Sequence, residues 1–155
     1  MIATSAGCLQ GLSLSQWATL RTLRQPIVWV LHLAYAWLPV GLALKAVALL
    51  AGSAIAAFLL HALTIGAVTT MIMGVMTHAS LGHTGRALVV DPLIALTYAL
   101  LTAAAVVRVF GLAGLRLSYP VVIIWSSVFW TAAFAIFIAV YAPILWMPRA
   151  DGKPG

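Results

Sequence analysis

The sequence predicts an all-α protein built as a multi-pass bundle of transmembrane helices. Of its 155 residues, 65% are hydrophobic and only 6% are charged, whereas a typical soluble domain is about 25% charged. Eight lysines and arginines and two aspartates are too few to cover the surface of a soluble fold. Apolar runs long enough to cross a bilayer follow one another along the chain. A soluble enzyme and a disordered chain are therefore excluded.

Residues 27–147 are predicted to form a four-span domain, beginning with the run Ile27–Leu50. This first run contains Pro39 and carries Lys45 near its end, and the second run, Ser53–Thr77, follows after two residues. About 20 apolar residues, rising 1.5 Å each, cross a hydrocarbon core of about 30 Å. Because lipid offers no hydrogen bonds to an open backbone, each run must be helical.

The third and fourth spans are Leu93–Phe110 and Val121–Leu145. Asp91-Pro92 precedes the third span, as an N-cap followed by a proline in the first helical turn. Pro143 and Pro148 close the fourth span, and residues 148–155 are predicted to form a cytoplasmic tail.

Residues 1–26 form an N-terminal segment without a complete span. The stretch Ala3–Leu14 is weakly apolar and too short to cross a bilayer, and Gly7 and Gly11 weaken it as a helix. We interpret it either as a surface segment or as the remnant of a preceding span.

The positions of the basic residues predict the orientation. One side of the bilayer would carry five of them and the other side three, which favours cytoplasmic termini because cytoplasmic loops are enriched in lysine and arginine. The two sets are Arg21, Arg24, Arg86, Arg149 and Lys153, and Arg108, Arg116 and Lys45. Basic residues at the edges of spans do not form a nucleic-acid surface, so no nucleic-acid partner is expected. The single Cys8 excludes an intrachain disulfide.

Small residues recur every four positions along the second span. Ala62, Gly66, Thr70 and Gly74 would form one ridge, which lets a neighbouring helix backbone approach closely. We favour helix packing for this ridge over a ligand channel.

The sequence contains no set of residues for hydrolysis. Both carboxylates, Asp91 and Asp151, lie at span edges, and no Ser-His-Asp set or phosphate-binding glycine loop is present. A proton pump with buried acids is therefore excluded within this chain.

His32 and His61 lie inside spans, where each is predicted either to bind a ligand or to pack helices through hydrogen bonds. If the first two spans run antiparallel and their midpoints lie at the same depth in the bilayer, His32 lies about 10 Å from that midpoint on one side. His61 lies about 6 Å from it on the other side. A separation of about 16 Å is too large for one metal ion or one haem. A second haem ligand would come from another segment, another subunit or solvent.

Other candidates surround the end of the second span. On a helix, His78 and His83 point about 140° apart, so His83 and Arg86 are compatible with an ordinary helix end. Met71, Met73 and Met76 lie at the depth of His32, and thioethers suit Cu(I), although methionine in a span is more often filler. Arg108 is predicted to extend toward the interface, with anion binding as the alternative.

The second span and its polar end closely resemble the signature of the NnrS family. The matching residues are His61-Ala62-Leu63-Thr64, Met76-Thr77 and Ala79-Ser80-Leu81-Gly82-His83-Thr84-Gly85-Arg86. The resemblance extends over nearly all of the chain from about Arg21 onward. It includes Leu23 through Pro39, Arg108-Val109-Phe110 and Pro148 through Gly155.

This resemblance implies a multi-pass protein of the bacterial inner membrane that binds haem and copper. It also implies a link to denitrification, to nitric oxide and to nitrosative stress. Carried over residue by residue, it identifies His32, His61 and His83 as cofactor and metal ligands, and Arg86 as a further site residue. His78 departs from the family pattern, which has arginine there, and is not carried over.

Family members are longer bundles, and the chain resembles their C-terminal part. We therefore expect either a gene fragment or truncated form, or a chain that pairs with a separate N-terminal piece or with further copies of itself as a homo-oligomer. The lipid bilayer and nitric oxide are further expected partners. Whether the protein is an enzyme is left open. Two other functions remain: a component of a small-solute transporter, and a membrane scaffold without metal.

Overall fold

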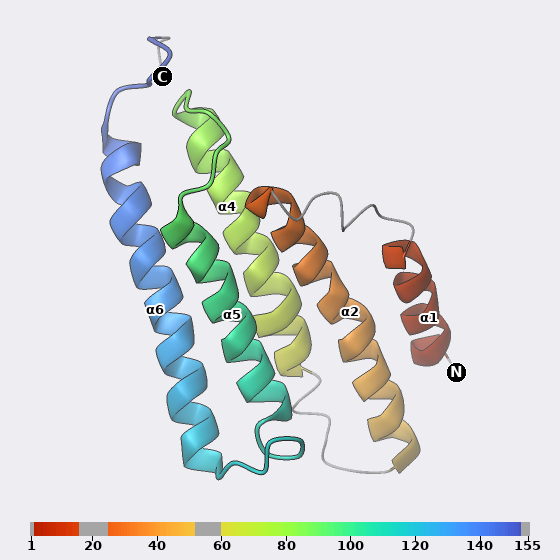
Figure 1. Ribbon diagram of the computed structural model, residues 1–155. Coiled ribbons are helices and arrows are strands. Elements are labelled where there is room, and N and C mark those ends of the chain that lie inside the picture. The colour runs from red at the N-terminus through yellow and green to blue at the C-terminus, as the bar shows by residue number, and fades with distance from the viewer. Residues whose placement is uncertain (1, 16–24, 52–59, 153–155) are drawn as a thin grey trace.

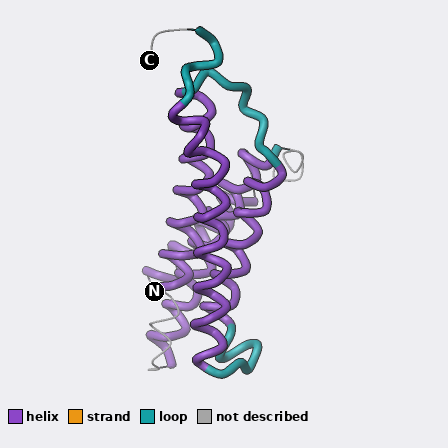
Figure 2. The backbone as a smooth tube through the Cα atoms, turned by 90° about the vertical axis from the view of Figure 1, so that its left-hand side faces the viewer, coloured by secondary structure: helices purple, strands orange, loops and turns teal. Residues whose placement is uncertain are grey.

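The computed structural model describes residues 2–15, 25–51 and 60–152, which fold into helices that lie side by side (Figure 1). The elements are α1 (Ile2–Ser15), α2 (Pro26–Ala51), η2 (Ala62–Thr69), α4 (Thr70–His83), α5 (Pro92–Phe110) and α6 (Tyr119–Trp146). Over the described residues there is no strand, which confirms the predicted all-α class. Seen from the side, the bundle is elongated along the helix axes (Figure 2).

Four helices are long and apolar enough to cross a membrane, as the sequence predicted. They are Pro26–Leu50, Ala62–His83, Pro92–Phe110 and Tyr119–Trp146, and η2 continues directly into α4 to form the second of them. The chain therefore has the architecture of a multi-pass membrane protein.

The predicted end of the second span, at Thr77, is wrong by six residues, because the helix continues to His83. Its polar side chains bond to the helix itself: Thr77 Oγ1 donates to Met73 O at 2.9 Å, and Thr84 Oγ1 donates to Ser80 O at 2.6 Å. Because these hydroxyl groups already have hydrogen-bond partners within the helix, the helix does not end where the apolar run ends. The predicted start at Ser53 lies outside the described residues.

The N-terminal segment forms the helix α1, although its glycines predicted a weak one. At 14 residues it is about 21 Å long, so it is too short to span, as expected. It packs on α2, where a Cβ at Gly7 would lie 3.5 Å from Leu42 Cβ and the Tyr35 hydroxyl donates to Gln10 Oε1. Tertiary contact with α2 therefore compensates for the low helix propensity of this segment.

The ridge of small residues packs against α2, which confirms the packing interpretation. Ala62 and Thr70 are fully buried, and Gly66 and Gly74 are buried as well. A Cβ at Gly66 would collide with the Trp37 ring, and one at Gly74 would lie 2.9 Å from Val30 Cγ1.

The helices α5 and α6 complete the core. Asp91 caps α5 as predicted, since its carboxylate accepts a 2.7 Å hydrogen bond from the Leu93 amide. Tyr98 is fully buried, donates to Thr77 Oγ1 at 2.9 Å and meets Trp29 edge to face. This side-chain hydrogen bond ties α5 to α4 in the centre of the bundle.

Candidate functional site

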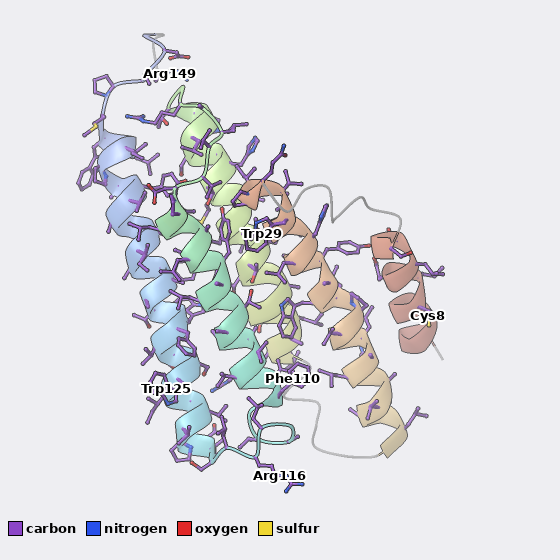
Figure 3. All side chains as sticks on the ribbon, in the orientation of Figure 1. Cys8, Trp29, Phe110, Arg116, Trp125 and Arg149 are labelled. Carbon is purple, nitrogen blue, oxygen red and sulfur yellow. The ribbon has the colours of Figure 1, made fainter. Side chains whose placement is uncertain are left out.

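A polar cleft of about 400 Å³ lies between η2, α5 and α6. It is found where α5 ends and α6 begins, near Phe110 and Trp125 in Figure 3. Its lining residues are His61, Thr64, Ile65, Arg108, Ile123, Ser126, Ser127, Trp130 and Thr131. A site of this polarity is unusual between helices that are otherwise apolar.

The wall formed by the second span is a π-helix. Here the backbone closes wider turns, and Thr69 Oγ1 donates to Thr64 O, five residues earlier, at 2.9 Å. His61 immediately precedes this segment, so the change of helix type occurs at the cleft. Single turns of π-helix are frequent at functional sites.

The hydroxyl groups of the cleft differ in their partners. Thr64 donates to Leu60 O at 2.7 Å and Ser126 to Ile123 O at 3.1 Å, so both are bonded to their own helices. Ser127 and Thr131, one turn apart on α6, are exposed and have no hydrogen-bond partner among residues 2–15, 25–51 and 60–152. Their hydroxyls are therefore available to a ligand.

Arg108 contributes the permanent positive charge of the cleft. It lies two residues before the end of α5 and is partly buried. Its guanidinium has five N–H donors and no acceptor. Sequence reasoning assigned Arg108 chiefly to the interface and missed the serines and Thr131, although polar residues within an apolar span were a visible signal.

His32 is remote from this cleft. Gly41 of α2 lies against Ala62 and Leu63, so His61 is level with the second half of α2. Gly74 lies against Val30 and Leu31, so the first part of α2, which contains His32, is level with α4. About ten residues of α2 separate the two levels, or about 15 Å. The register therefore agrees with the predicted separation of the two histidines.

His83 and Arg86 lie at the opposite end of the second span and contact the C-terminal segment, which carries Arg149 (Figure 3). Arg149 donates to His83 O at 2.9 Å and forms a two-point ion pair with Asp151, whose closer contact is 2.7 Å. That bonding raises the pKa of Arg149. Gly85, at φ +69°, turns the chain at this point. The hydrogen bonds of Arg149 and of the Ala150 amide dock the tail on the end of α4.

Arg86 has a buried donor without an acceptor. Its Nη2 lies 4.0 Å from Met147 Sδ, while its Nη1 is buried and has no partner in the part of the chain that the structure describes. A buried unsatisfied donor is costly, so this atom marks a place for an acceptor.

The remaining candidates do not join these sites. His78 lines a separate cleft of about 760 Å³ with the start of α2 and the α4–α5 loop. Met73 is fully buried in the core, Met76 is partly exposed, and Met71 lines a small apolar cleft of about 200 Å³. The three thioethers therefore face different surroundings and do not form one ligand set.

Within the described ranges, no three histidine, cysteine or acidic side chains come together as a metal site. A single imidazole, His61, is directed at the polar cleft, and His32 and His83 lie elsewhere. Among the described residues, the three predicted histidines therefore do not come together in one site.

Over residues 1–149 the chain matches the family model described as NnrS protein. The match begins before Arg21, from which the sequence resemblance extends, and so it includes α1. No curated protein and no solved structure matches the chain. Because the match covers almost all of its residues, the chain belongs to the NnrS family.

Proposed function

We propose that this protein binds haem and copper in the bacterial inner membrane and acts in nitric oxide metabolism or in the response to nitrosative stress. The observation that carries the proposal is the family match over residues 1–149, together with the haem and copper that the resemblance implies. Four apolar helices of spanning length support a membrane location. The apolar helices admit a small uncharged gas, and the C-terminus faces the cytoplasm.

In this proposal His32, His61 and His83 each supply one ligand. Neutral imidazole suits both iron and copper. Haem also carries two carboxylates, and the buried Nη1 of Arg86 is a donor that lacks an acceptor. Arg86 would hold one such carboxylate, while bound metal would supply the site that coordinates nitric oxide.

His61 and Arg86 serve different cofactors. The helices η2 and α4, together the 22 residues Ala62–His83, lie between them and extend over about 30 Å, which exceeds the reach of one haem. The ligands that these four helices lack come from further helices or from a second copy of the chain. Two separated sites are consistent with two metals of different chemistry.

The test is purification of the full chain in detergent after expression with haem and copper supplied. We expect a Soret band and measurable iron and copper. His61→Ala and His83→Ala are expected to deplete different metals, and His78→Ala, whose side chain lines the other cleft, is expected to retain both.

A sample without a Soret band and without either metal would overturn the proposal. It would leave a scaffold as the interpretation, or a transporter if vesicles showed solute flux without metal. Loss of metal from His78→Ala, with retention in the other two variants, would contradict the assigned ligands while leaving the cofactors in place.

A further inference from the structure

Arg108 is a permanent cation without an acidic side-chain partner among the residues that the structure describes. A guanidinium stays protonated in proteins, and the sequence contains only two acidic side chains, Asp91 and Asp151. Asp91 caps the other end of α5, 17 residues and about 25 Å away. Asp151 is paired with Arg149 at the far end of the bundle (Figure 3).

The cleft adds neutral donors beside this charge. Ser127 and Thr131 are four residues apart and therefore lie on one face of α6, and both line the cleft with Arg108. Their hydroxyls are not used by the described residues. One guanidinium with two hydroxyls is a donor set suited to the oxygens of an anion.

Position within the bundle strengthens such binding. Ser127 and Thr131 are the ninth and thirteenth residues of α6, about 12 to 18 Å along the helix from its start. Low-dielectric surroundings increase the attraction between a cation and an anion.

We propose that the cleft between η2, α5 and α6 binds a phosphate-type oxyanion, with Arg108 supplying the charge and the hydroxyls of Ser127 and Thr131 donating hydrogen bonds. The shared chemistry is an anionic phosphate, either a free ion or the head group of an anionic lipid. Basic pockets between transmembrane helices bind such head groups. This site requires neither haem nor copper.

The experiment uses the full chain without added metal in nanodiscs of phosphatidylcholine. Inorganic phosphate is titrated at constant ionic strength, and the shift in melting temperature is measured. In a second arm, phosphatidylglycerol replaces part of the lipid, and retained lipid is counted by native mass spectrometry. A response to phosphate identifies the free ion, and retention of phosphatidylglycerol alone identifies the lipid; either result supports the site.

Arg108→Gln is expected to weaken the response by about tenfold or more, since a charge-assisted contact is lost. The matched control is Arg116→Gln, which removes the same charge from the exposed loop at the same end of the bundle and should leave the response unchanged. Arg108→Lys should restore part of it, and Ser127→Ala with Thr131→Val should weaken it. Circular dichroism checks that each variant is folded.

Equal binding by the Arg108→Gln and Arg116→Gln proteins would overturn the proposal. So would the absence of any response of the wild-type protein to both phosphate and phosphatidylglycerol. Because no metal is present, these outcomes are independent of whether the protein binds haem or copper.

Discussion

Gly66→Ala is expected to destabilise the bundle, because the added methyl group would occupy the space of the Trp37 ring. A Cβ at this position would lie 2.5 Å from Trp37 Cγ and 2.9 Å from Cε3, whereas carbon atoms at rest are about 3.5 to 4.0 Å apart. Trp37 is 6% exposed and stacks on Phe110, with 6.3 Å between ring centroids. The ring therefore has little room to move away.

Overpacking of a core costs about 1 to 3 kcal/mol, and an overlap with an enclosed aromatic ring belongs at the upper end of that range. Alanine recovers about 1 kcal/mol through helix propensity. We expect the free energy of unfolding to fall by about 2 kcal/mol, and the melting temperature by about 4 to 8 °C for a chain of this length. Thermal unfolding of the purified protein in detergent measures the change.

Gly82→Ala is the matched control, because a Cβ there meets nothing within 4 Å. It should leave stability unchanged or raise it slightly. A double-mutant cycle isolates the contact: in a Trp37→Ala background, Gly66→Ala should cost much less. If Gly66→Ala were as harmless as Gly82→Ala, or cost the same with and without the Trp37 ring, the steric argument would be refuted.

Three further changes are expected to alter the same melting temperature. Tyr98→Phe removes the 2.9 Å hydrogen bond to Thr77 and should cost about 1 kcal/mol; if Thr77→Val added its full cost on top, the bond would not be the cause. Arg116→Gly should stabilise the protein by about 1 kcal/mol, because Arg116 has φ +52° and glycine adopts this conformation without a steric penalty. An unchanged or lower melting temperature would count against backbone strain at this position. Gly85→Ala should destabilise the protein by about 1 to 2 kcal/mol, since Gly85 has φ +69° and an added Cβ would lie 2.6 Å from Asp151 Cγ. The C-terminal tail should also be proteolysed faster in this variant.

Hydropathy alone predicted most of the fold. A charged fraction of 6% demands a lipid environment, and runs of about 20 apolar residues locate the spans to within a few residues. The Asp91-Pro92 pair marked the start of α5 because an N-cap and an early proline have local causes. The end of the second span was missed because polar residues up to His83 bond to their own helix.

Sequence also determined the family and the ridge of small residues. The polar residues between His61 and Arg86 are specific enough to identify NnrS, and the four-residue spacing of Gly66 and Gly74 implies close packing whatever the partner. The separation of His32 and His61 along the bundle followed from the helical rise alone. The register between α2 and the second span agrees with that separation.

Only the tertiary structure decided which side chains meet. A span that is apolar on all sides carries no periodic signal to show which face meets which neighbour. Arg108, Ser127 and Thr131 come from two helices, and His61 comes from a third, so their common cleft required the helices to be placed together. Likewise, Arg149 reaches the end of α4 across 66 positions of sequence. The sequence determined the lipid environment, the membrane spans and the family, because these depend on local composition and local motifs. The site depends on contacts between distant segments, which only the tertiary structure shows.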